Sequence, residues 1–250
     1  MLLNISTTEY INFALITAAI VIGYKFIESF WSYRISKPYV WENRSANNNS
    51  SNKLLNQIEF RYNDKVRFYN FWLQIERIKR ENIIGDFAEL GVHKGKSAKA
   101  IYNMDPERKL HLFDTFEGFS NKDLENEPVQ NRVIDAKMFK DTSLKKVRSY
   151  INGSDRVIYY PGVFPDTTKD LEHLTFAFVN IDADLYSPTL SALHFFYPRL
   201  SPGGVLIVHD YNHNWDGVKK AINEFAPSIK ENLIEIPDIH GSVMIIKNRS

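Results

Sequence analysis

The chain has 250 residues, of which 44% are apolar and 24% charged, and its formal net charge is +1. Such a length and composition suit one globular α/β domain with additional N-terminal material. The near-neutral charge gives no electrostatic basis for a nucleic-acid partner, and the absence of cysteine excludes disulfides, thiolate catalysis and zinc–sulfur sites. A chain without cysteine also fits a cytoplasmic compartment.

The first feature in chain order is an apolar run, YINFALITAAIVIGY, at residues 10–24. The run is apolar on all sides rather than along one face. We therefore favour a membrane anchor within residues 1–42, with membrane contact through residues 10–31, over a helix that caps the domain. The basic residues follow the run and would keep the downstream domain on the cytoplasmic side of the membrane; they are Lys25, Arg34 and Lys37.

A polar segment of low complexity, NRSANNNSSN, follows at residues 43–52. A segment of this composition cannot pack into a core, so we place a linker at residues 43–53 and a domain at residues 54–250. Residues 54–80 have apolar side chains at helical spacing, and we interpret their aromatic stripe as core.

A glycine-containing turn, DFAELGVHKGKS, occupies residues 86–97. The pattern predicts a short strand that ends near Glu89 and a helix that begins near Ser97, whose free N–H groups could bind the polar end of a ligand. Its glycine spacing matches neither the phosphate loop nor the dinucleotide G-x-G-x-x-G pattern. A plain strand–helix turn is the alternative.

The second predicted strand, at residues 110–113, ends in Asp114. An acidic residue about twenty residues beyond a glycine turn, at the end of the second strand, is a common ligand of ribose hydroxyls. The alternative is a solvated aspartate at a strand end.

The middle and the end of the chain continue the alternation of strands and helices. Residues 121–143 lack periodicity and predict a long surface excursion, which is typical of a functional lid or of disorder. The remaining predicted elements are a helix at 144–151, a strand at 156–160, a helix at 215–225 and strands at 233–236 and 242–246. Together they predict a doubly wound, mostly parallel sheet with an antiparallel strand at its end.

Carboxylates and a histidine follow two further predicted strands. Residues 176–181 lead to Asp182 and Asp184, a helix is expected from residue 188, residues 201–204 predict a turn, and residues 205–208 lead to His209 and Asp210. Parallel strands place their carboxyl ends at one edge of a sheet, so these side chains are expected to converge. The alternative for the aspartate pair is to cap the following helix.

Five motifs in order resemble the macrocin O-methyltransferase family: residues 86–97, FDTFEGF at 113–119, PGVFPDT at 161–167, IDADLYSPT at 181–189, and the glycine pair at 203–204 with HDY at 209–211. The similarity runs from about residue 60 to about residue 225. It implies a seven-stranded class I methyltransferase sheet of Rossmann-like type. It also implies methyl transfer from S-adenosylmethionine to a sugar hydroxyl, assisted by Mg²⁺.

The resemblance also implies roles for individual residues. Glu89 and Gly91 would lie beside the methionine part of the cofactor, Asp114 would bind the ribose, and Gly162 and Phe164 would lie near the adenosine. Phe116 of the second motif is expected among the cofactor-binding residues as well. The implied metal ligands are Asp182, His209 and Asp210, and Asp184 is the implied catalytic base.

One position departs from the family, which usually has Asp-Asp-Tyr where this chain has His209, Asp210 and Tyr211. Mg²⁺ prefers oxygen ligands, so a histidine would favour Mn²⁺ or a later transition metal. Alternatively, His209 does not bind the metal.

The expected function is an O-methyltransferase whose acceptor is a small molecule or glycan, most simply a sugar or glycosylated metabolite. The alternatives are a phenolic or other small acceptor and a non-catalytic binding module that keeps the fold. His213, in the turn after Tyr211, is the additional histidine that could approach an acceptor. The apolar N-terminal helices could also pack between subunits of a homo-oligomer.

Overall fold

The structure is a computed structural model, and it describes residues 6–31, 37–44, 50–125, 127, 134–135, 137–214 and 216–249. The chain divides into two compact units, Met1–Glu42 and Asn43–Ser250. The centre of the predicted linker, residues 45–49, lies outside the described residues, and the described residues on both sides of it are helical.

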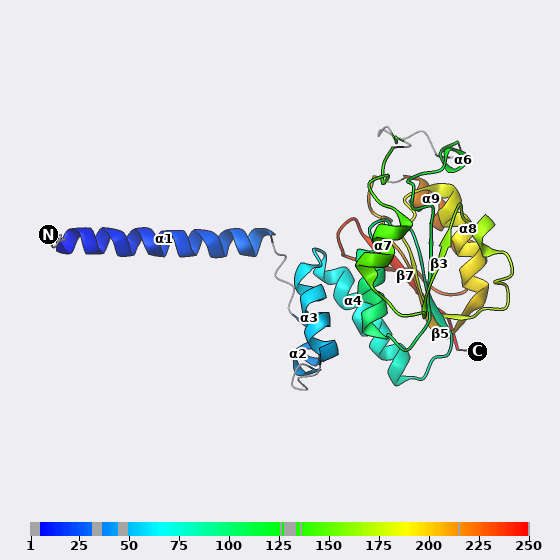
Figure 1. Cartoon of the computed structure of the whole chain (residues 1–250), viewed down its shortest axis with the longest axis horizontal. Coiled ribbons are helices and arrows are strands. Elements are labelled where there is room, and N and C mark those ends of the chain that lie inside the picture. Colours follow the sequence, from blue (N-terminus) through cyan, green and yellow to red (C-terminus); the bar gives the residue numbers. More distant parts are fainter. Residues whose placement is uncertain are drawn as a thin grey trace. The chain divides into compact units, whose positions relative to one another are not determined.

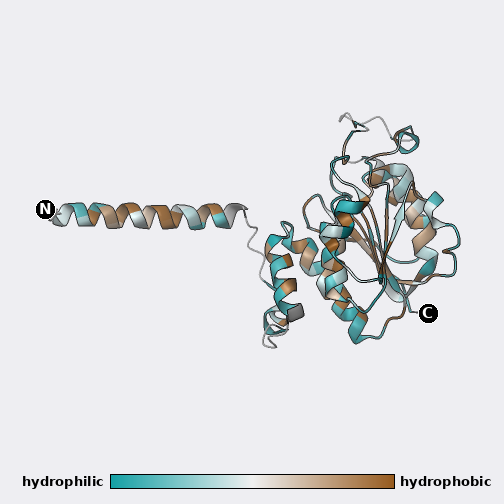
Figure 2. Ribbon diagram, viewed as in Figure 1, coloured by the Kyte–Doolittle hydropathy of each residue, from teal (hydrophilic) through white to brown (hydrophobic). Residues whose placement is uncertain are grey.

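The N-terminal unit contains the long helix α1 (Thr7–Trp31), and the short helix α2 (Tyr39–Arg44) follows. Within the described residues, Thr7–Glu28 is the one stretch long and apolar enough to cross a membrane, and none of it is buried. Figure 2 shows hydrophobic residues along much of α1. Phe13 and Ile22, for example, are 72% and 68% exposed. Soluble proteins seldom expose a large continuous patch of apolar side chains.

The second unit is a three-layer α/β structure (Figure 1). Its helices are α3 (Ser50–Arg61), α4 (Lys65–Arg80), α5 (Lys96–Met104), α6 (Asn121–Leu124), α7 (Leu144–Ile151), α8 (Tyr186–Phe196) and α9 (Asp216–Phe225). Its strands are β1 (Asp86–Leu90), β2 (Leu110–Asp114), β3 (Val157–Pro161), β4 (Phe176–Ile181), β5 (Leu200–Val208), β6 (Ile234–Ile236) and β7 (Ser242–Ile246). Helix α5 packs with α3, α4 and α7, whereas α8 packs with α9.

The sheet has the order β3-β2-β1-β4-β5-β7-β6. The first five strands are parallel, and β7 is antiparallel to both β5 and β6. Every residue of β4 is buried, because helices cover both faces of the sheet. The predicted seven-stranded, mostly parallel sheet is therefore confirmed.

One local prediction is wrong, and another is refined. The helical pattern of residues 54–80 is confirmed, but it forms two helices, because Asp64 caps α4 by accepting a hydrogen bond from the Arg67 N–H at 3.0 Å. The turn predicted at residues 201–204 is part of β5 and forms a bulge, since the β4 partners shift from Leu200 to Val205 between Phe176 and Phe178. Glycines there permit a bulge as readily as a turn.

Smaller differences concern element boundaries. Helix α8 begins at Tyr186, two residues before the predicted start. The predicted excursion contains α6, and its residues 126, 128–133 and 136 lie outside the described residues, as does Trp215 before α9.

Candidate active site

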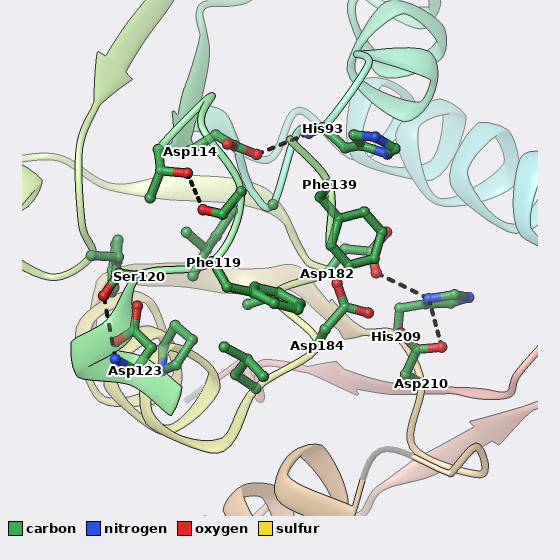
Figure 3. Close-up of a pocket in the computed structure, with 18 of the residues that line it drawn as sticks. His93, Asp114, Phe119, Ser120, Asp123, Phe139, Asp182, Asp184, His209 and Asp210 are labelled. Carbon is green, nitrogen blue, oxygen red and sulfur yellow. Dashed lines mark hydrogen bonds and ion pairs between the residues drawn. The ribbon is translucent and has the colours of Figure 1, made fainter. Parts of the chain in front are cut away.

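A cavity of about 350 Å³ opens at the carboxyl edge of the parallel strands (Figure 3). It lies where β1 and β4 are neighbours, which is the point where the order of the sheet reverses and where ligands bind in open α/β sheets. Four sequence-predicted cofactor residues line it: Gly91, Asp114, Gly162 and Phe164. All four carboxylate and histidine residues of the predicted metal site and base line it too: Asp182, Asp184, His209 and Asp210.

The turn after β1 brings the backbone of two strands into close contact. Gly91 has a φ of 87°, and a Cβ atom there would lie 1.9 Å from the carbonyl oxygen of Asp182. The Asp182 N–H donates to the Leu90 carbonyl at 2.8 Å, which joins the ends of β1 and β4. Only glycine fits this turn.

Asp114 organises the same turn from the end of β2. One carboxylate oxygen accepts hydrogen bonds from the N–H groups of Val92 at 2.6 Å and His93 at 2.8 Å. The other accepts from the Phe116 N–H at 2.5 Å. A carboxylate has about four acceptor positions, so one remains for a hydroxyl donor.

Glu89 and Phe116 are not among the residues that line the cavity. Glu89 is fully buried at the end of β1, and one of its oxygens accepts a hydrogen bond from the Asn180 Nδ2 at 2.8 Å. Burial raises the pKa of Glu89 to about 8, although hydrogen bonds and Arg67 favour the charged form.

This burial predicts a pH-dependent stability. Because the pKa of Glu89 rises from 4.5 to about 8 on folding, the folded chain holds a proton between these values that the unfolded chain releases. Stability should therefore fall as the pH rises through this window. Glu89→Gln should make stability to urea fall less steeply between pH 5 and 8 and add about 1–3 kcal/mol at pH 8. Glu172→Gln, at an exposed site, should keep the wild-type slope; an unchanged slope in Glu89→Gln would contradict the prediction.

Three carboxylates meet at the ends of β4 and β5. Asp182, Asp184 and Asp210 each place one oxygen within 4.8 Å of the others. Asp184 and Asp210 have positive φ values of 61° and 64°, which non-glycine residues seldom adopt. The backbone thus holds these two side chains towards the cavity at some conformational cost.

His209 lies between two of these carboxylates. Its Nδ1 is 3.0 Å from Asp182 Oδ1 and 3.3 Å from Asp210 Oδ1. Its Nε2 lies 2.8 Å from the Ile239 carbonyl oxygen, which can only accept, so Nε2 carries a proton. The backbone therefore fixes the ring with Nδ1 towards the carboxylates.

The surroundings of the cluster shift the pKa values of its members in different directions. Burial raises the pKa of Asp184 well above its ordinary value, and the neighbouring Asp182 and Asp210 add to this. Burial opposes the charged forms of Asp182 and His209, but Arg67 and His209 hold the pKa of Asp182 well below its usual range. The Asp182 carboxylate likewise raises the pKa of His209 to about 10 against the effect of burial.

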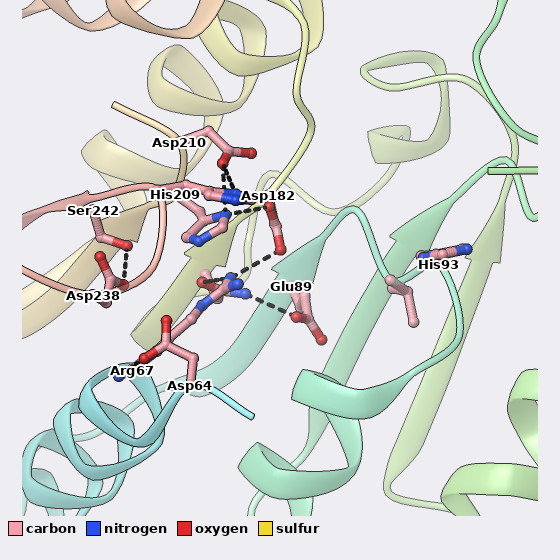
Figure 4. A network of polar contacts seen from close by, with 12 residues as sticks. Asp64, Arg67, Glu89, His93, Asp182, His209, Asp210, Asp238 and Ser242 are labelled. Carbon is pink, nitrogen blue, oxygen red and sulfur yellow. Dashed lines mark hydrogen bonds and ion pairs between the residues drawn. The ribbon is translucent and has the colours of Figure 1, made fainter. Parts of the chain in front are cut away.

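The sequence reasoning missed Arg67 of α4. Its Nη2 donates to Asp182 Oδ2 at 2.9 Å and to Asn180 Oδ1 at 3.3 Å, and the residue is 7% exposed (Figure 4). The only sign of this role in the sequence was a charged residue within the apolar helical pattern of residues 54–80.

His240 was also missed. Its Nδ1 lies 3.1 Å from Asp210 Oδ1, and the centroid of its ring lies 3.9 Å from the centroid of the His213 ring. His213 and His240 line the cavity, which agrees with the expected position of His213. Nothing in the local sequence pairs residue 240 with residue 210.

A divalent cation fits this donor set. Carboxylate oxygens from Asp182, Asp184 and Asp210 converge, and the Nδ1 of His209 faces the same space and would bind a cation after releasing its proton. Burial raises the pKa of Asp184, the neighbouring Asp182 and Asp210 raise it further, and a cation among these carboxylates would relieve their repulsion.

The strand order, the glycine turn after β1 and the acidic residue after β2 define a class I S-adenosylmethionine-dependent methyltransferase fold. The model of the macrocin-O-methyltransferase (TylF) family matches residues 43–243. The chain therefore belongs to this family, which confirms the resemblance of the five motifs.

Individual relatives agree with this assignment, since they are O-methyltransferases. The chain is 29% identical over 170 residues to 8-demethyl-8-(2,3-dimethoxy-alpha-L-rhamnosyl)-tetracenomycin-C 4'-O-methyltransferase from Streptomyces olivaceus, and the alignment covers 64% of each chain. It is 28% identical over 189 residues to mycinamicin III 3''-O-methyltransferase from Micromonospora griseorubida, covering 70% of this chain and 69% of the relative. The structure of the O-methyltransferase NovP superposes on this chain with a TM-score of 0.62 and 26% sequence identity. The superposition covers 74% of this chain and 81% of NovP.

Proposed function

We propose that the protein is an S-adenosylmethionine-dependent O-methyltransferase that methylates a hydroxyl of a sugar or glycosylated metabolite with the help of a divalent cation. The observation that carries this proposal is the convergence of Asp182, Asp184, His209 and Asp210 in one cavity with the glycine turn of β1. Two relatives support a sugar acceptor: one is named for a rhamnosyl compound and the other for a 3''-hydroxyl of mycinamicin III.

The reaction needs an aligned acceptor and a place for its proton. S-adenosylmethionine supplies a methyl group on a sulfonium, and a divalent cation stabilises negative charge that develops on a hydroxyl oxygen. Asp182, His209 and Asp210 would hold the cation. Asp184 would accept the proton of the acceptor hydroxyl, and the cavity walls would hold the reactants at reacting distance.

The test is calorimetric titration of S-adenosylhomocysteine into the full-length protein, with and without Mg²⁺ or Mn²⁺. We expect micromolar binding, which would support the cofactor class. A folded protein that shows no binding would overturn the methyltransferase proposal and leave a non-catalytic binding module.

Asp114 offers a second test of the cofactor site. Asp114→Ala should weaken S-adenosylhomocysteine binding about 10–100-fold, because it removes a charged acceptor for ribose hydroxyls and the anchor of the β1 turn. Asp155→Ala, at an exposed site before β3, is the matched control and should bind normally. An unchanged dissociation constant for Asp114→Ala would contradict the assignment.

The acceptor class separates the proposal from its alternative. Methyl transfer to glycosylated compounds, measured with labelled cofactor, would support a sugar acceptor. Transfer to catechols or other phenols alone would favour the alternative.

The oligomeric state stays a prediction from the sequence.

We further propose that α1 anchors the protein in a membrane, with the second unit on the cytoplasmic side. The candidate span of 22 residues would measure about 33 Å as a helix, against a hydrocarbon thickness of about 30 Å. Lys25 lies near the C-terminal end of the span and Lys37 follows it, as expected for a cytoplasmic C-terminal side. The full-length protein should float with liposomes and resist alkaline carbonate extraction, whereas Ile16→Arg/Ile20→Arg should reduce both. Carbonate-extractable wild-type protein would contradict the anchor.

A further inference from the structure

We propose that His240 is a metal ligand, so that the centre binds a divalent first-row transition ion through two imidazoles and carboxylates in preference to Mg²⁺. The proposal deepens the proposed function, on which it rests for the presence of a cation in the cavity. Neither the family motifs nor the expected ligand set includes His240.

Neighbouring donor atoms in this cluster are as far apart as adjacent ligands of one ion. Asp182 Oδ1 lies 3.0 Å from His209 Nδ1, His209 Nδ1 lies 3.3 Å from Asp210 Oδ1, and Asp210 Oδ1 lies 3.1 Å from His240 Nδ1. Ligands about 2.1 Å from one ion lie about 3.0 Å apart at right angles and about 3.4 Å apart in a tetrahedron. One donor atom from each of His209, Asp210 and His240 lies within 4.8 Å of the others. His209, Asp210 and His240 therefore form one candidate cation group, which shares Asp210 with the group of Asp182, Asp184 and Asp210.

The sheet topology places His240 beside residues 209 and 210. Strand β7 is antiparallel to β5, with Val243 opposite Val208, so the residues before β7 meet the residues after β5. The Tyr211 N–H donates to the Gly241 carbonyl at 2.8 Å and closes this junction. His240 thus reaches the carboxyl edge from the end of a hairpin rather than from a parallel strand.

The turn that carries His240 is held from several sides. The Ile239 N–H donates to Asp64 Oδ2 at 2.8 Å, and the Ser242 hydroxyl donates to Asp238 Oδ2 at 2.6 Å (Figure 4). The Ile239 carbonyl accepts from His209 Nε2, so the same turn orients a second imidazole. His240 itself has a φ of 72°. A ligand needs such support from surrounding hydrogen bonds to bind an ion tightly.

Two imidazoles change the expected ion. Imidazole nitrogen suits later first-row ions, whereas Mg²⁺ requires oxygen ligands in a nearly octahedral shell. The His240 side chain is 45% exposed, which gives an ion a path into the centre. A carboxylate at position 209 with no histidine at 240 would instead give an oxygen shell.

The test is a titration of the full-length protein with MnCl₂, CoCl₂ and MgCl₂, with nitrogen couplings to bound Mn²⁺ measured by pulsed EPR. Wild-type protein should bind Mn²⁺ and Co²⁺ at least about 10-fold more tightly than Mg²⁺ and show two coordinated imidazoles. His240→Gly should lose at least about 10-fold in Mn²⁺ and Co²⁺ affinity and show one imidazole. Glycine adopts the φ of residue 240 without strain, and His240→Asn is a second variant that tolerates it.

His173→Ala, at an exposed site, is the control and should behave as wild type. S-adenosylhomocysteine binding in the absence of metal reports on the methyltransferase proposal and on folding. Normal cofactor binding with unchanged Mn²⁺ affinity and two imidazoles in His240→Gly would overturn the role of His240 alone. Equal losses of Mn²⁺ and Mg²⁺ affinity in that variant would also overturn it, since a nitrogen ligand should affect Mn²⁺ selectively. Cofactor binding without any cation binding by the wild type would overturn the metal centre but not the methyltransferase.

Discussion

Asp184→Asn is expected to lower kcat by about 10²–10⁴-fold, which is the usual contribution of a general base. Asparagine keeps the size of the side chain but cannot accept the proton of the acceptor hydroxyl. Burial, and then Asp182 and Asp210, raise the pKa of Asp184, so Asp184 is the strongest base of the cluster once a bound cation favours its ionised form. Asp184 lines the cavity in which the proposed acceptor would bind.

The measurement is single-turnover methyl transfer at saturating cofactor, acceptor and Mn²⁺, together with calorimetric binding of S-adenosylhomocysteine. Cofactor affinity should stay within about twofold of wild type, because the predicted cofactor residues Gly91 and Asp114 are intact. Asp155→Asn controls for loss of one carboxylate elsewhere on the surface. Wild-type turnover in Asp184→Asn would remove this residue as the base.

Gly91→Ala is expected to destabilise the second unit by at least about 3 kcal/mol or to prevent folding. The new Cβ would lie 1.9 Å from the carbonyl oxygen and 2.5 Å from the carbonyl carbon of Asp182. These are backbone atoms at the end of a buried central strand, so the strand itself must move. The movement would also displace Asp182 from the cluster.

Gly95→Ala provides a graded comparison in the same turn. Gly95 also has a positive φ, of 78°, but the atoms nearest to its Cβ would belong to the side chains of Val147 and Ile151, at 3.1 Å and 3.2 Å, rather than to the backbone. That variant should lose only about 1–2 kcal/mol, the cost of the left-handed conformation. Urea unfolding of both variants separates the backbone collision from the conformational cost. Equal losses in the two would show that the contact with Asp182 does not decide the requirement for glycine.

The sequence alone determined the parallel part of the fold and most of the candidate site. Apolar runs such as residues 176–181 identify buried strands, because a strand covered on both faces carries mostly apolar side chains. Parallel strands bring their carboxyl ends together, so Asp182, Asp184, His209 and Asp210 could be placed at one edge from the order of elements alone. The residue roles came from the family resemblance and remain to be tested.

The tertiary structure decided what depends on contacts between distant segments. The glycines at 203 and 204 allow a turn or a bulge equally well, and the pairing of β5 with its neighbours selects the bulge. Arg67 lies in a helix whose pattern reports only which face is buried, not that its guanidinium reaches Asp182. His240 meets Asp210 because β7 runs antiparallel to β5, and strand direction is not encoded by local periodicity. Local patterns specify which faces are buried, whereas the partners of a buried charge depend on how the layers pack.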